Sequence, residues 1–109
     1  DEPLLDAVTA ISGSGPAYVF YFIEAMVAAG VRMGLTPAQA HQLAVGTFVG
    51  SAELARSASD SPAVLRERVC SPGGATIAGV AVLEDAGVRG AVARAVGAAA
   101  RRAAELASK

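Results

Sequence analysis

The stretch from Pro16 to Met33 constrains the fold most, because its apolar residues fall on every side of a helix. Pro16 suits a first helical turn, and Gly34 suits a left-handed helix end. Only Glu24 and Arg32 are charged within the stretch. A helix that is apolar all round is buried all round. In a chain of 109 residues, this predicts that a second chain covers one face of the helix.

Caps and chain breakers predict four further helices. Thr36-Pro37-Ala38-Gln39 combines an N-cap, a first-turn proline and the glutamine of a capping box, so a second helix should run from there to Ser57. The segment Leu4 to Ile11 could be extended, although it has no partner strand. The expected fold is therefore an all-α bundle of about five helices. The other three predicted helices are Pro62 to Val69, Ala75 to Ala86 and Val88 to Ala107.

Two glycines lie inside the second predicted helix. Gly46 and Gly50 are four residues apart and therefore share one face. Glycine in a helix interior costs about 1 kcal/mol relative to alanine, so the pair suggests that another helix approaches closely. That helix could belong to the same chain or to a second copy, and the sequence leaves both readings open.

Composition narrows the partners and the compartment. The formal net charge is −1, with no run of basic residues, so no nucleic-acid partner is expected. A single cysteine, Cys70, allows no internal disulfide, and we expect a cytoplasmic protein. The stretch from Met33 to Ala52 has no charged residue and is long enough to span a bilayer. Its polar groups, among them Gln39 and His41, would be unsatisfied in lipid, so no membrane span is expected.

The segment Gly13-Ser14-Gly15-Pro16-Ala17-Tyr18 mimics the start of a dinucleotide-binding fingerprint. Tyr18 stands where the third glycine is needed, and Pro16 removes a backbone N–H that a phosphate would use. A long helix follows, and not a strand with an acidic residue. We interpret the segment as a turn that starts the first long helix, with exposed amides that could still touch a ligand.

The segment from Cys70 to Gly79 has the strongest chemical signal. Gly73 and Gly74 would let the backbone approach a ligand closely. The predicted helix after them points free N–H groups and the positive end of its dipole toward that ligand, which favours a small anion such as a carboxylate. Ser71 and Thr76 add hydroxyl groups. The alternative is a capped helix start with no ligand, since Ser-Pro-Gly-Gly is a common turn.

His41 and Cys70 are two further candidate residues. His41 has no Cys, Asp or Glu at metal-ligand spacing, so it is expected to be a surface or packing residue, and no metal site is predicted. Cys70 has no neighbouring histidine and is expected to be a small buried apolar residue. Its place beside the possible anion site leaves a reactive thiol as an alternative.

Two long motifs resemble pyrroline-5-carboxylate reductases. The first is Pro62-Ala63-Val64-Leu65, three residues, and then Val69 to Val80 with Leu83-Glu84. The second, Ala7 to Tyr18, resembles the opening of that family's C-terminal domain. Gly30 to Leu35 resembles the end of the family's first long helix. The resemblance extends over nearly the whole chain without a gap.

The resemblance implies a reduction of 1-pyrroline-5-carboxylate to L-proline with NADPH or NADH, which is the last step of proline synthesis. It implies that residues 1–109 are the C-terminal helical dimerisation and substrate-binding domain, similar to the C-terminal domain of 6-phosphogluconate dehydrogenase. Such domains form an interlocked homodimer, and some family members form larger assemblies. A Rossmann domain that holds most of the cofactor would be absent from this chain, so the isolated chain is expected to be inactive.

The resemblance also assigns roles to individual residues. Thr76 would place its hydroxyl near the ring nitrogen of the substrate, and Val69 would lie near the nicotinamide. The residues that would cradle the substrate carboxylate are Ser71, Gly73, Gly74, Ala75 and Thr76. Without the resemblance, two classes stay open, namely a non-enzymatic helical dimerisation module and a helical domain of a related dehydrogenase that acts on another small acid. A pure interaction module would not need the anion-binding helix start.

Overall fold

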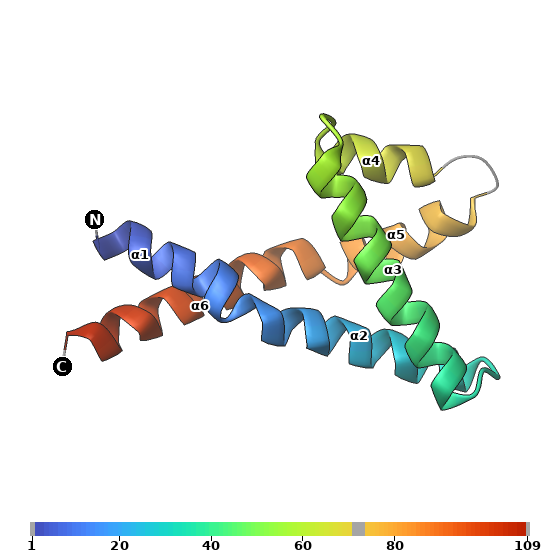
Figure 1. The fold of residues 1–109 in the computed structure, drawn as a ribbon, viewed down its shortest axis with the longest axis horizontal. Helices are drawn as coiled ribbons and strands as arrows, with labels where there is room; N and C mark the ends of the chain where they lie inside the picture. Colours follow the sequence, from blue (N-terminus) through green and yellow to red (C-terminus); the bar gives the residue numbers. More distant parts are fainter. Residues whose placement is uncertain (1, 71–73, 109) are drawn as a thin grey trace. The chain divides into compact units, whose positions relative to one another are not determined.

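The chain is all-helical in the computed structural model, which describes residues 2–70 and 74–108 (Figure 1). This confirms the predicted all-α fold, and each of the five predicted helices is present with ends within about one residue of the expected ones. One further α-helix and a π-helix precede them. The elements are α1 (Glu2–Val8), the π-helix η1 (Thr9–Gly13), α2 (Gly15–Arg32), α3 (Pro37–Ser57), α4 (Pro62–Val69), α5 (Ala75–Asp85) and α6 (Val88–Ala107).

Local side-chain caps explain where α3 and α4 begin. The Thr36 hydroxyl accepts a hydrogen bond from the Gln39 amide at 3.1 Å, and the Gln39 side chain accepts one from the Thr36 amide at 3.0 Å. This reciprocal pair is the predicted capping box. Ser61 caps α4 by accepting from the Val64 amide at 3.2 Å. Gly34, with φ of 110°, supplies the left-handed turn expected after α2.

The expectation of an extended segment from Leu4 to Ile11 is wrong. These residues form α1 and most of η1, and the Ser14 amide donates to the Thr9 carbonyl at 2.9 Å, five residues back. A short apolar run does not distinguish a strand from a buried helix by its pattern alone. With no strand among the described residues to pair with, a helix satisfies the backbone hydrogen bonds of this segment locally.

The chain divides into two compact units, of which the first combines Asp1–Tyr18 with Ala75–Lys109. In this unit α6 packs against α1 and η1, and α5 leads into α6. Figure 1 shows α1 and α6 crossing closely. Ala10 on η1 is fully buried, with 0% of its surface exposed. The centre of the first unit is therefore the methyl group of Ala10, and not a cluster of large apolar side chains.

The second unit, Val19–Gly74, contains most of α2, all of α3 and α4, and Gly74. Ala40 and Ala44 on α3 are its buried side chains, 3% and 5% exposed. Gly30 on α2 allows this close packing, because a Cβ there would lie 3.2 Å from the Ala40 Cβ and 3.2 Å from Leu35 Cδ1. The missing side chain at Gly30 thus lets α3 pack closely against the backbone of α2.

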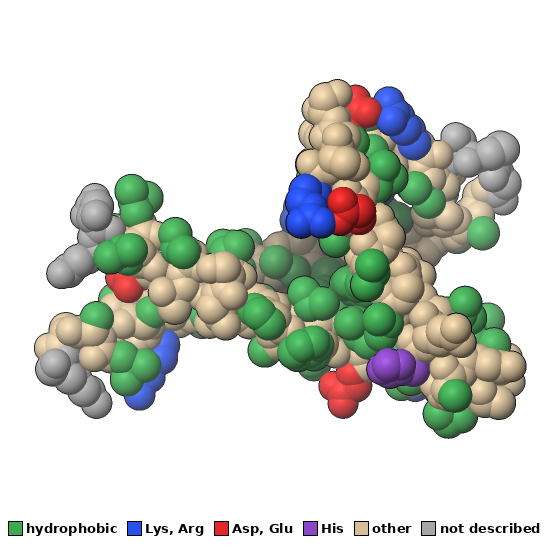
Figure 2. All heavy atoms as spheres, in the orientation of Figure 1, with side chains coloured by type: hydrophobic (Ala, Val, Ile, Leu, Met, Phe, Trp, Pro, Cys, Tyr) green, Lys and Arg blue, Asp and Glu red, His purple; other side chains and the backbone are tan. Residues whose placement is uncertain are grey.

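Large apolar side chains lie mostly on the surface of both units. Leu4, Phe20 and Tyr21 are 66%, 67% and 70% exposed, and Figure 2 shows many apolar side chains on the face in view. Among the described residues, the helical stretch Pro3–Arg32 is the one long and apolar enough to cross a membrane by length and composition alone, with a mean hydropathy of 1.2. None of its apolar 18-residue window is buried within the chain, which fits the sequence-based expectation that a second chain covers α2.

Candidate functional site

The start of α5 matches the predicted position of an anion-binding helix end. Ala75 is the first residue of α5 and Thr76 the second, and both are exposed. The first amides of a helix have no acceptor within it, and the amides of Ala75, Thr76 and Ile77 make no hydrogen bond to another described residue. These donors lie at the positive end of the dipole of an 11-residue helix.

Gly74 precedes this helix start with a left-handed backbone. Its φ is +79°, a conformation that side-chain-bearing residues rarely adopt. A Cβ at Gly74 would meet nothing within 4 Å, so backbone conformation and not space requires glycine here. Ser71 and Gly73, the other two residues expected in the substrate cradle, lie with Pro72 outside the described residues.

Val69 and Cys70 end α4 in the second unit. Val69 is 64% exposed and lines a shallow hollow of about 290 Å³ between α3 and α4, together with Leu54 and Leu65. The Cys70 amide donates to the carbonyls of Arg66 and Glu67, each at 3.1 Å. The expectation that Cys70 is buried is wrong, since the side chain is half-buried. At the end of a short helix, the residue is only partly covered.

The segment from Gly13 to Tyr18 lies in a nearly continuous helical stretch, in which Gly13 ends η1, Ser14 is a single bend and α2 begins at Gly15. The amides of Ser14 and Ala17 donate to the carbonyls of Thr9 and Ser14, at 2.9 and 3.1 Å. Pro16, between them, has no amide proton. Two donors that a phosphate would need are therefore already used within the chain, which argues against a phosphate loop, and the expected turn is reduced to the bend at Ser14.

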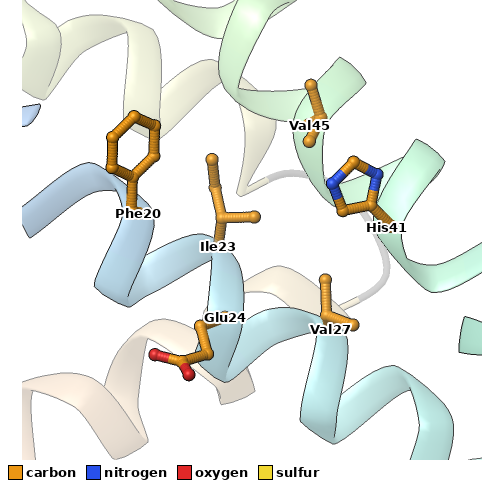
Figure 3. Close-up of a pocket in the computed structure, with 6 residues that line it drawn as sticks. All are labelled: Phe20, Ile23, Glu24, Val27, His41 and Val45. Atoms are coloured by element: carbon orange, nitrogen blue, oxygen red, sulfur yellow. The ribbon is translucent and has the colours of Figure 1, made fainter. Parts of the chain in front are cut away.

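A groove between α2 and α3 was not identified from the sequence. It has a volume of about 650 Å³, and Figure 3 shows Phe20, Ile23 and Val27 of α2 opposite Val45 and His41 of α3. The only sequence signal for this groove was the helical spacing of its α2 residues, and that signal was weak because α2 is apolar on every side. The imidazole of His41 is exposed at the groove wall, which confirms the expected surface position. Glu24 also lines the groove, but its carboxylate points away from the apolar side chains (Figure 3).

Charged groups elsewhere form surface pairs. The Arg89 guanidinium donates a hydrogen bond to the Glu84 carboxylate at 2.5 Å. This hydrogen bond and the attraction between the two charges raise the pKa of Arg89. Arg68 and Asp60 are 2.8 Å apart in the second unit. Among the described residues, no group of three or more His, Cys, Asp or Glu side chains is placed to hold a metal ion.

Residues 2–106 match the family described as pyrroline-5-carboxylate reductase dimerisation. The pyrroline-5-carboxylate reductase of a Synechocystis strain is 54% identical over 108 residues, which are 99% of this chain and 40% of that protein. The corresponding protein of Kluyveromyces lactis is 42% identical over 108 residues, again 99% of this chain, and 38% of the yeast protein. The chain therefore spans about two fifths of the length of these curated relatives.

Solved structures give the same result. The structure of a Coxiella burnetii pyrroline-5-carboxylate reductase superposes with a TM-score of 0.93 at 40% identity, over 97% of this chain and 39% of that one. A Plasmodium falciparum pyrroline carboxylate reductase, crystallised with NADP bound, superposes with a TM-score of 0.89 at 38% identity, over 94% of this chain and 39% of that one. The chain thus belongs to the pyrroline-5-carboxylate reductase dimerisation family.

Proposed function

We propose that this chain is the dimerisation and substrate-anchoring part of a pyrroline-5-carboxylate reductase, which reduces 1-pyrroline-5-carboxylate to L-proline with NADPH or NADH. The observation that supports the proposal is the exposed start of α5, whose first amides bond to no other described residue, behind a left-handed Gly74. The matched family is named for a carboxylate substrate, and the start of a helix such as α5 is suited to binding a carboxylate.

The substrate carboxylate would be anchored by the segment from Ser71 to Thr76. The backbone amides of Ala75 and Thr76 donate to it at the positive end of α5, and the hydroxyls of Ser71 and Thr76 add donors. Gly73 and Gly74 keep side chains away from the ring. Because α5 already fixes its amides, they lose little conformational freedom when the anion binds.

Thr76 would orient the imine of the substrate. Its hydroxyl, on the second residue of α5, would form a hydrogen bond at the ring nitrogen, where a proton must be added as the adjacent carbon is reduced. A threonine hydroxyl of ordinary acidity is a poor proton donor. Thr76 therefore positions the nitrogen or relays a proton from water, and does not act as a strong general acid.

Val69 is the residue of this chain that would contact the nicotinamide ring of the cofactor. Its exposed isopropyl group provides an apolar contact suited to one face of a nicotinamide ring. When bound, the reduced cofactor supplies the hydride for the imine carbon. The described residues contain no strand, so we propose that a dinucleotide-binding domain outside them holds the pyrophosphate. The isolated chain would then bind a second copy of itself but would not reduce the substrate. We also propose a cytoplasmic location.

Substitution of Thr76 in the full-length protein tests the chemistry. Thr76→Ala should fold and associate normally yet lower kcat/KM for 1-pyrroline-5-carboxylate about tenfold to a hundredfold, which corresponds to about 1–3 kcal/mol for one hydrogen bond in a dry site. Thr76→Ser should keep most of the activity. Thr47→Ala is a matched control, because the Thr47 hydroxyl is bonded within α3 to the Leu43 carbonyl at 2.8 Å.

Two outcomes would contradict this assignment. Full activity of Thr76→Ala would remove Thr76 from the reaction. Equal damage in Thr76→Ser would mean that the methyl group matters and the hydroxyl does not. A full-length protein that forms dimers but reduces no cyclic imine would favour the alternative of a non-enzymatic dimerisation module.

A further inference from the structure

We draw no further inference here: the strongest candidate, the apolar groove between α2 and α3 that is lined by Phe20, Ile23 and Val27, carries none, because a second copy of the chain on this groove would restate the dimerisation of its family and nothing in the structure shows what else covers it.

Discussion

The two compact units pack in the same way, around buried alanines, but they leave different groups exposed on their surfaces. The first unit buries Ala10 and the second buries Ala40 and Ala44, so both use the smallest apolar side chain for contacts within the chain. The first unit leaves a helix start at Ala75 whose amides bond to no other described residue, and it also leaves exposed apolar side chains on α1 and η1. The second leaves an apolar groove between α2 and α3.

This difference separates the surfaces that suit chemistry from those that suit association. Backbone amides at the start of α5 suit a small polar ligand, whereas the groove of Phe20, Ile23 and Val27 suits another apolar surface. In both units, small residues pack within the chain and large apolar residues face outward. That arrangement is the reverse of a self-sufficient globular domain, in which large apolar side chains form the core.

The largest effect should follow from placing a charge at the centre of the first unit. Ala10→Asp puts a carboxylate where 0% of the residue surface is exposed, with no partner provided, and should lower the free energy of unfolding by more than about 3 kcal/mol. Chemical denaturation measures the loss. Ala7→Asp, on the exposed side of α1, is the control. Equal losses in both variants would show that the first unit is not centred on Ala10.

The next effect concerns the close helix approach in the second unit. Gly30→Val adds atoms where a Cβ already lies 3.2 Å from Ala40 and Leu35, and should cost about 1–3 kcal/mol through overpacking. Gly90→Val, opposite a flexible arginine end, should cost much less. Thermal unfolding of the two variants gives the comparison. If the two midpoints fall equally, α2 and α3 do not depend on the missing side chain at Gly30.

Smaller losses should follow removal of the helix caps, and only in the second unit. Thr36→Ala removes half of the capping box of α3, and Ser61→Ala removes the cap of α4; each should cost about 1 kcal/mol. In the first unit, α6 begins at Val88 after Gly87, which has no side chain to cap it, so no equivalent substitution can be made at that helix start. If the denaturation midpoints of both variants match that of the wild type, water replaces these caps without loss of stability.

These caps also explain how much of the fold could be predicted. Thr36-Pro37 and Ser61-Pro62 mark helix starts through bonds to amides three residues on, so the sequence alone determines them. The segment from Leu4 to Ile11 was misread because its structure depends on packing against α6, which no local pattern reveals. The π-helical bond from Ser14 to Thr9 has no sequence signature of this kind.

The parts of the candidate site that depend on one short segment could likewise be predicted from the sequence. The helix start at Ala75 and the need for glycine at position 74 follow from chain breakers in one segment. The groove between α2 and α3 depends on which faces two helices turn toward each other, so periodicity on a helix apolar all round could not locate it. The half-buried state of Cys70 likewise depends on how little of the chain covers the end of α4.

The smallest effect is expected at the exposed pair of Arg89 and Glu84. The pair raises the pKa of Arg89, so its contribution to stability is present below the ordinary arginine pKa and is lost only as pH rises through the higher folded value. The charge of this arginine therefore does not change between about pH 6 and pH 9. Arg89→Ala should leave the thermal midpoint nearly unchanged across that range, and added salt should remove any difference. A pH-dependent midpoint shift in this variant would contradict that expectation.

Among the described residues only alanines are buried, and this has a kinetic consequence. Since many large apolar side chains stay exposed within each unit, we expect the last step toward the native state to be an encounter between two chains. Its rate then rises with protein concentration, and dilution slows it without any change in sequence. Newly made chains wait for a partner with sticky surfaces exposed, which makes them candidates for aggregation and for chaperone binding in that interval. Synthesis of two copies near each other would shorten this wait.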